Sequence, residues 1–178
     1  MRRLARLLHA IGRDCGGTTM VEFAVAFPIL LTMYMGSFAL SDALACNRKV
    51  TVATRALTDL TTRYSIITPN DLNMIMAASQ QVLAPYAASE AQIVISQVRV
   101  TDATHGEVEW SRTRNGTALE EEEDITIPQN IAAVDTRLIV GSISYTYTPP
   151  VLFGITQPIT FSDTILMSPR LSDEIELR

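Results

Sequence analysis

The most prominent pattern in the chain is a run of nineteen residues without a charge, from Phe23 to Ser41. As an α-helix, at about 1.5 Å per residue, this run is roughly 28 Å long, close to the ~30 Å hydrocarbon thickness of a bilayer. Charged residues are spread through the rest of the chain, as in a soluble domain. The pattern therefore predicts one transmembrane helix, over residues 18–45, followed by a single extracytoplasmic domain over residues 46–178.

Beyond the apolar run, the spacing of hydrophobic residues stays helical as far as Tyr64. Apolar side chains recur at intervals of three and four residues and so share one helix face: Val50, Ala53, Leu57, Leu60 and Tyr64. Other side chains are expected to face elsewhere: Arg48, Arg55, Thr58 and Arg63. The first helix is therefore expected to run from about Thr18 to Tyr64.

A second helix is predicted over residues 69–83, because its start carries a capping pattern. Thr68 can cap the helix, Pro69 takes the first helical position and Asp71 the third, while Pro85 ends the helix. Its expected buried side comprises Leu72, Ile75, Met76, Ser79, Val82 and Leu83.

From Gln92 onward the hydrophobic period changes to two, which predicts β-strands. Strands are expected around residues 92–100, 107–112, 137–148 and 159–167, with a tight turn at Asn115-Gly116. The predicted fold class is α+β, with an antiparallel sheet against the second half of the long helix.

Charge is divided unevenly along the chain. Before Thr18 there are four arginines and one aspartate, a net charge of +3, whereas the whole chain carries −5 and residues 18–178 therefore carry −8. A basic flank before an apolar span places the N-terminus in the cytoplasm. The acidic remainder, with no basic stripe evident in the sequence, argues against nucleic acid as a partner.

The junction between the basic flank and the apolar run reads Cys-Gly-Gly-Thr-Thr-Met-Val-Glu-Phe over residues 15–23. A secretory signal is cut after its apolar core, but here glycine precedes the core. The arrangement resembles the type IV prepilin pattern, which has glycine at −1 and glutamate at +5. That resemblance implies a basic leader over residues 1–17, a cut by prepilin peptidase between Gly17 and Thr18, and Glu22 as the +5 acid.

The sequence after this junction, Val-Glu-Phe-Ala-Val-Ala-Phe-Pro-Ile-Leu-Leu over residues 21–31 with Gly36 beyond, resembles the opening of TadE-like proteins. The segments 144–149 and 167–170 are similar to the last two strands of that family. The resemblance implies a pilin-like fold and a minor pilin of a tight-adherence (Tad/Flp) pilus, which serves adhesion and biofilm formation.

The same resemblance implies that the protein sits in the bacterial inner membrane with its C-terminal domain in the periplasm. Its expected partners are prepilin peptidase, the major Flp pilin, a TadF-like minor pilin and the inner-membrane platform of the Tad machine.

The position of Glu22 also indicates a functional role on physical grounds. A carboxylate at the edge of an apolar helix costs several kcal/mol unless it is paired or neutral, so such residues tend to be functional. The resemblance implies that Glu22 pairs with the free α-amino group of Thr18 on a neighbouring subunit. The alternative is a glutamate at the level of the lipid headgroups, satisfied by water.

The chain offers little sequence evidence for catalysis. His105 is the one histidine beyond the leader and is expected in a solvated turn with Gly106, no nucleophile motif accompanies it, and no spacing of metal ligands is evident. The acidic run over residues 120–124 is best explained as a solvated loop rather than a calcium site. We expect no enzyme activity, no cofactor and no small-molecule substrate.

The two cysteines, Cys15 and Cys46, flank the apolar run and cannot pair with each other if it spans a membrane. For Cys46, a free thiol and a disulfide to another subunit are both open.

Two alternative functions also remain. One is a pseudopilin of a type II secretion system. The other is a secreted or lipid-anchored periplasmic protein cut before Cys46, where Ala-Leu-Ala over residues 43–45 resembles an export site. Against that reading, Glu22 and Asp42 would lie in or beside the export core.

Overall fold

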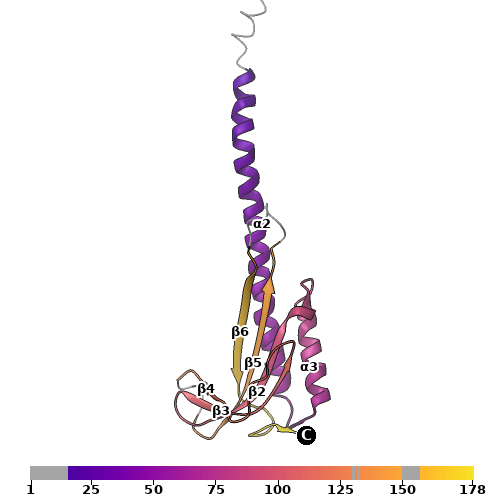
Figure 1. The fold of residues 1–178 in the computed structure, drawn as a ribbon, viewed down its shortest axis with the longest axis vertical. Helices are drawn as coiled ribbons and strands as arrows, with labels where there is room; N and C mark the ends of the chain where they lie inside the picture. Colours follow the sequence, from indigo (N-terminus) through magenta and orange to yellow (C-terminus); the bar gives the residue numbers. More distant parts are fainter. Residues whose placement is uncertain (1–15, 130, 132, 150–156) are drawn as a thin grey trace, which may run out of the picture. The chain divides into compact units, whose positions relative to one another are not determined.

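The computed structural model describes residues 16–129, 131, 133–149 and 157–178. The chain divides between Ser41 and Asp42 into two compact units, and the long helix α2 (Gly16–Thr61) contributes to both (Figure 1). The remaining elements are β1 (Ile66–Ile67), α3 (Pro69–Val82), the short 3-10 helix η1 (Ala88–Glu90), β2 (Gln92–Val100), β3 (His105–Arg114), β4 (Asp124–Thr126), β5 (Arg137–Tyr147), β6 (Ile159–Met167) and β7 (Glu176–Leu177).

The first unit consists, in its described part, of the α2 residues up to Ser41. Most of the large apolar side chains on this stretch are exposed, among them Phe23, Ile29 and Phe38. The helix continues through Pro28, although the proline ring removes one backbone hydrogen bond. A helix this long and apolar can cross a membrane, so the first unit fits a membrane anchor.

The second unit contains a five-stranded antiparallel sheet with the strand order β4-β3-β2-β5-β6. Ile93 of β2 pairs with Ile143 of β5, and Ile95 pairs with Gly141, so the most apolar strands lie at the centre. Together with α2 this confirms the predicted α+β class, and β6 matches its predicted range of 159–167. A separate parallel pair, β1 with β7, was not predicted.

The main core lies between one face of this sheet and the second half of α2. On α2 the fully buried apolar side chains are Cys46, Val50, Ala53 and Leu57, which confirms the predicted face for the last three. They share a core with Ile93, Ile95, Ile139, Ile143 and Tyr145 of the sheet. The other two predicted members, Leu60 and Tyr64, are half-buried against this core, and Tyr64 lies beyond the end of the helix at Thr61. Because burial of apolar area drives folding, this face joins α2 and the sheet within the second unit.

Thr58 corrects one prediction about α2. The hydrophobic spacing had placed it away from the core, but its side chain is fully buried. The space comes from Gly141 on β5: a Cβ built there would lie 2.2 Å from the Thr58 Oγ1. The hydroxyl donates to the Thr54 carbonyl at 2.9 Å, so its burial leaves no unpaired polar group.

The second helix, α3, has the predicted start. Thr68 accepts a hydrogen bond from the Asp71 amide at 3.2 Å, and the Asp71 carboxylate accepts one from the Thr68 amide at 3.0 Å, which completes a capping box. Of the predicted buried side, Leu72, Ile75, Met76, Ser79 and Leu83 are buried and Val82 is half-buried. Gln80 is buried as well.

The opposite face of the sheet is covered by the segment between β3 and β4. Val98 and Val140 form a small cluster with Leu119 and Ile125. Asn115 adopts a left-handed conformation with φ 56° and lies with Gly116 in a bend after β3, but the next strand, β4, begins only at Asp124. His105 differs from its prediction: it is the first residue of β3 and pairs with Thr126 of β4, although its side chain remains 43% exposed.

The C-terminal segment closes the second unit, which the hydrophobic pattern did not indicate. The Trp110 indole donates to the Ile175 carbonyl at 3.1 Å, and the Ile175 amide donates to the Gln97 side chain at 2.8 Å. Arg170 forms an ion pair with Asp59 of α2 at 2.5 Å.

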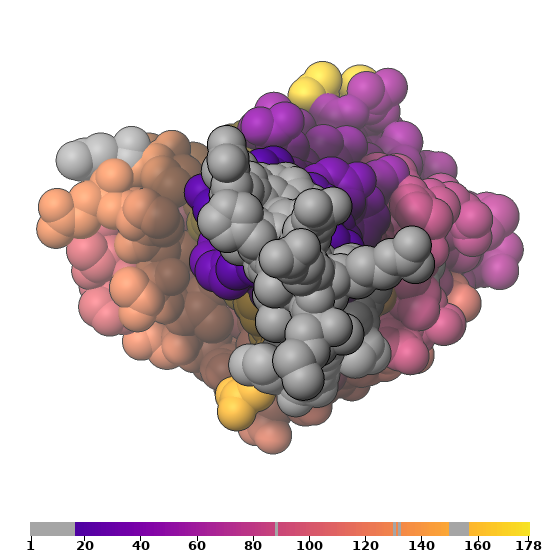
Figure 2. Space-filling view, turned by 90° about the horizontal axis from the view of Figure 1, so that it is seen from above, coloured from indigo at the N-terminus to yellow at the C-terminus, as the bar shows by residue number. Residues whose placement is uncertain are grey.

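In Figure 2, magenta residues of α3 and orange residues leading into β5 lie at opposite sides of the visible surface.

Candidate functional site

The residues predicted for processing lie in the first two turns of α2. Gly17, Thr18 and Glu22 are all exposed, and a Cβ built at Gly17 would meet nothing within 4 Å. The Gly17–Thr18 bond lies in the first turn of a helix, where amides lack helical partners and two adjacent glycines weaken the helix. A peptidase would therefore unwind about one weak turn to reach it. Residues 1–15 of the predicted leader lie outside the described residues.

Glu22 follows Thr18 by four residues, so both lie on one face of α2. Within the part of the chain that the structure describes, Glu22 forms no ion pair. A carboxylate that lies on an exposed apolar helix and has no cationic partner in its own chain can pair with a cation of another chain.

A second polar cluster surrounds Asp42, at the start of the second unit. The Tyr86 hydroxyl donates to Asp42 Oδ1 at 2.9 Å, and the Tyr147 hydroxyl donates to Asp42 Oδ2 at 2.5 Å. The rings of Tyr86 and Tyr147 meet edge to face with their centroids 5.9 Å apart. The cluster thus joins α2, the segment after α3 and the end of β5 through one carboxylate.

Burial and this carboxylate alter the ionisation of the neighbouring groups. Burial, and then the bond to Asp42, raises the pKa of Tyr86 to about 12, and the same causes raise the pKa of Tyr147. Burial, and then the Asp42 charge, raises the pKa of the Cys46 thiol to about 11. Cys46 is fully buried and protonated at neutral pH, so it fits a core side chain better than a reactive thiol or an intersubunit disulfide.

Sequence reasoning did not find this cluster, although two signals bear on it. Asp42 is the first acid after the apolar run, and Tyr147 belongs to the 144–149 segment that resembles the TadE-like family. Neither signal says that the two side chains meet, because they stand 105 residues apart.

Lys49 binds the same region from about two turns further along α2. Its ammonium group donates to the carbonyls of Val82 at 3.4 Å and Ala84 at 2.5 Å, at the C-terminal end of α3. A cation there satisfies free carbonyls and complements the helix dipole. With Tyr86 on Asp42, the segment that follows α3 is therefore attached to α2 at two points.

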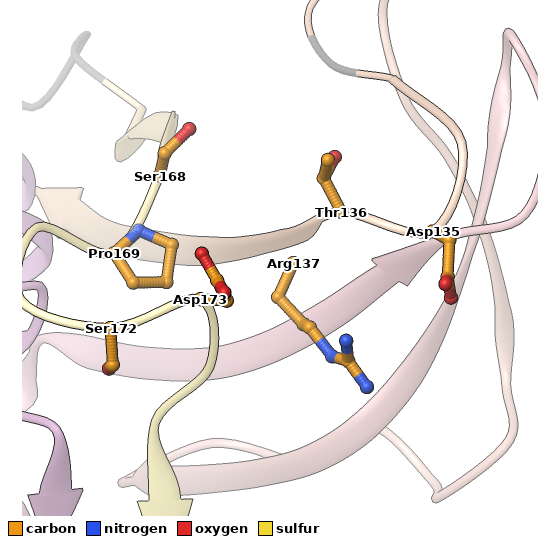
Figure 3. A pocket seen from close by; sticks show the side chains of 7 residues that line it. All are labelled: Asp135, Thr136, Arg137, Ser168, Pro169, Ser172 and Asp173. Carbon is orange, nitrogen blue, oxygen red and sulfur yellow. The ribbon is translucent and has the colours of Figure 1, made fainter.

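The pocket in Figure 3 has a volume of about 400 Å³ and lies between the start of β5 and the C-terminal segment. Its lining is polar: Asp135, Thr136, Arg137, Ser168, Pro169, Ser172 and Asp173. The Arg137 guanidinium is already held by Glu109 at 3.2 Å and Glu174 at 3.3 Å. Because this charge is neutralised, the pocket has the character of a structural ion-pair cluster rather than an anion site.

His105 and the acidic run over residues 120–124 are two further candidate sites. His105 Nδ1 lies 3.2 Å from the exposed Asp102 carboxylate, a local contact between residues three apart in the sequence. Among the described residues, no three histidine, cysteine or acidic side chains converge as metal ligands. Glu120 to Glu123 are exposed, as expected for a solvated loop.

Residues 17–58 match the model of the TadE-like protein family. No curated protein matches the chain, and neither does a solved structure. The matched segment begins at Gly17 and contains Thr18, Glu22 and Asp42. The resemblance drawn from the sequence is thereby confirmed over residues 17–58, where the chain is similar to TadE-like proteins.

Proposed function

We propose that the protein is a minor pilin-like subunit needed for assembly of a Tad/Flp pilus, cut by prepilin peptidase between Gly17 and Thr18. The observation that carries this proposal is where the TadE-like match begins. It starts at Gly17, the glycine expected at −1, and runs through the whole apolar part of α2. The TadE-like family supports a role associated with the Tad pilus, and processing is the finer step that we add.

In this proposal residues 1–17 form a cytoplasmic leader and residues 18–45 cross the inner membrane. The domain over residues 46–178 then lies in the periplasm, where the mature subunit primes the pilus, caps it or joins the fibre. The exposed apolar side chains of the first unit support this arrangement, because a single apolar helix in water would be unstable.

Glu22 then becomes the +5 acid, and its partner is the α-amino group that cleavage creates at Thr18 of a neighbouring subunit. In an apolar environment such a pair is much stronger than in water, and leaving either charge unpaired there costs several kcal/mol. The exposure of Glu22 and the lack of a partner among the described residues support an intermolecular pair.

The proposed partners are prepilin peptidase, the major Flp pilin, a TadF-like minor pilin and the membrane platform of the Tad machine. The role is structural rather than enzymatic, as expected of a pilin family. The sequence carries no phosphate-binding loop, so the energy for assembly would come from a separate ATPase.

The two alternatives are supported less well. A type II secretion pseudopilin would use the same cut, but the family match favours the Tad branch. A lipid anchor on Cys46 would require that thiol at an exposed N-terminus, whereas it is fully buried inside α2. The TadE-like match also continues past that position to residue 58.

Replacing Gly17 by leucine tests the processing step, with Gly16→Leu as the matched control. A Cβ at Gly17 meets no neighbour within 4 Å, so Gly17→Leu should leave the fold intact and block only recognition by the peptidase. Immunoblots of membranes should show unprocessed Gly17→Leu and processed Gly16→Leu. Normal-size mature protein from Gly17→Leu would contradict the proposal.

Replacing Glu22 tests assembly separately from processing. Glu22→Gln removes the charge and should reduce pilus formation at least tenfold, whereas Glu22→Asp keeps a carboxylate and should retain part of it. Surface pili can be counted by electron microscopy while the N-terminus is checked by mass spectrometry. Wild-type piliation of Glu22→Gln would exclude a required charge pair at this position.

A further inference from the structure

The outward face of α2 in the second unit carries an unpartnered stripe of side chains. This outer stripe consists of Arg48, Val52 and Arg55, at spacings of four and three residues, which places them on one helix face. Val52 is 56% exposed, and both arginines are exposed. The buried α2 side chains lie on the opposite face of the helix.

The two arginines of the outer stripe have no acidic partner in their own chain as far as the structure describes it. The ion pairs of the α2 region instead use Asp59, which binds Arg63 at 2.6 Å and Arg170 at 2.5 Å. Arg48 and Arg55 stand seven residues apart, so they lie about 10.5 Å apart along the helix axis. These two cations lie on either side of the exposed Val52 in a chain whose net charge is −5.

An acidic surface of matching character lies on the same unit. The acidic loop, residues 120–124, contains five consecutive carboxylates, and within the described part of the chain none of them pairs with a cation. The loop is held in place by its backbone: the Glu122 amide donates to the Val108 carbonyl at 2.8 Å, and the Val108 amide donates to the Glu123 carbonyl at 3.0 Å. The backbone of Glu122 and Glu123 is therefore anchored to β3.

The outer stripe and the acidic loop belong to opposite sides of the second unit. Along β5, Gly141 faces Thr58 of α2, so the adjacent Val140 faces away from α2. Val140 packs with Leu119, which directly precedes the acidic loop. The order of layers is thus outer stripe, α2, sheet, acidic loop. A single unit cannot bring its two charged surfaces together.

We infer that the outer stripe of α2 is the docking surface for the acidic loop of a second copy of this chain. Such a contact is heterologous, since each copy offers one surface and receives the other, and it repeats along a line of copies rather than closing a symmetric dimer. The inference rests on the proposed function only in placing both copies in the same membrane or fibre.

Site-specific cross-linking tests the contact in the full-length protein in native membranes. Two differently tagged chains are co-expressed, one with Val52→Cys in the outer stripe and one with Thr117→Cys beside the acidic loop, both exposed positions. A bis-maleimide spanning about 10 Å should give a heterodimer carrying both tags. Both chains also carry Cys15→Ser, because an uncut chain keeps that second cysteine in its leader. Chains without the added cysteines should then give no dimer, because Cys46 is buried. Dimers formed equally well by either chain with its added cysteine alone would overturn the heterologous contact.

Charge reversal tests whether the contact is electrostatic. Arg48→Glu with Arg55→Glu on the Val52→Cys chain should reduce the heterodimer at least tenfold, and Glu121→Lys with Glu122→Lys on the other chain should restore it. The matched control places Glu90→Lys and Asp173→Lys on the Thr117→Cys chain. It makes the same change in net charge at exposed residues elsewhere, and the heterodimer yield should stay within twofold of the yield without these two changes. Unchanged yield after reversal of the arginines would overturn the inference.

The same samples separate this inference from the proposed function. Processing at Thr18 is read from the N-terminal peptide, and docking is read from the cross-link. Processed chains that give no heterodimer would refute the docking surface alone. A heterodimer from chains that are never cut at Gly17 would refute the processing step alone.

Discussion

Gly141 provides the most quantitative test of how α2 packs on the sheet. A Cβ at this position would lie 2.2 Å from Thr58 Oγ1, 3.3 Å from Thr58 Cβ and 3.5 Å from Ile95 Cδ1. The first distance is far below van der Waals contact, and Thr58 is fully buried with its hydroxyl bonded to the Thr54 carbonyl. Overpacking of this kind costs about 1–3 kcal/mol, more than the ~0.5–1 kcal/mol that alanine gains over glycine inside a strand.

We therefore expect Gly141→Ala to lower the free energy of unfolding by about 2 kcal/mol. Thr58→Ala removes the clashing oxygen together with one hydrogen bond, at a cost of about 1 kcal/mol. In the Thr58→Ala background the nearest atom to the new methyl group is the Cβ at 3.3 Å. There, Gly141→Ala should cost about 0.5 kcal/mol or less, so the two changes should couple by roughly 1.5 kcal/mol.

The assay is urea unfolding of the full-length protein in non-ionic detergent, followed by the fluorescence of Trp110, the one tryptophan in the chain. Its indole is buried and bonded to the C-terminal segment, so its emission reports on the sheet. Gly36→Ala is the matched control, because a Cβ there meets nothing within 4 Å and the midpoint should stay the same. Additive effects of the Gly141 and Thr58 changes would refute the close contact.

Other predictions concern the Asp42 cluster and the start of α3. Tyr86→Phe removes a hydrogen bond to the Asp42 carboxylate and should destabilise the protein by about 1.5–3 kcal/mol at neutral pH. Folding raises the pKa of Tyr86 from 10.0 to about 12 and that of Cys46 from 9.0 to about 11. The contribution of these two groups to the free energy of unfolding is therefore present at lower pH and is lost between pH 9 and 12. Urea midpoints measured across that range should fall for the wild type, and the decline above pH 10 should be shallower in Tyr86→Phe; an identical decline would contradict the raised tyrosine pKa. Thr68→Ala removes the acceptor for the Asp71 amide and should cost about 1 kcal/mol in the same assay, whereas Thr68→Ser should be near neutral. Equal losses in both Thr68 variants would count against the cap.

Local sequence signals predicted the helices and the central strands well. The capping pattern at Thr68 and the three- and four-residue spacing from Val50 to Leu57 each depend on neighbours in sequence, and the structure has both. Strand β6 was predicted because apolar residues alternate along it. Such signals need no knowledge of distant contacts, which explains their success.

Long-range contacts could not be predicted in the same way. Thr58 was placed outside the core because it lies off the three- and four-residue spacing of the apolar side chains, and only the absence of a side chain at Gly141 makes room for it. The β1–β7 pair joins two-residue strands, too short to show any period. The Asp42 cluster depends on a contact with Tyr147 across 105 residues. In each case the deciding partner is remote in the sequence.

The measurement that tests the proposed function most directly is the N-terminus of the protein purified from membranes of its native host. Intact mass and N-terminal peptide sequencing should show a mature chain that begins at Thr18 and lacks residues 1–17. That result would make Glu22 the fifth residue of the mature subunit. A chain beginning at Cys46 would instead show that the apolar run is an export signal, and it would contradict the minor pilin-like function.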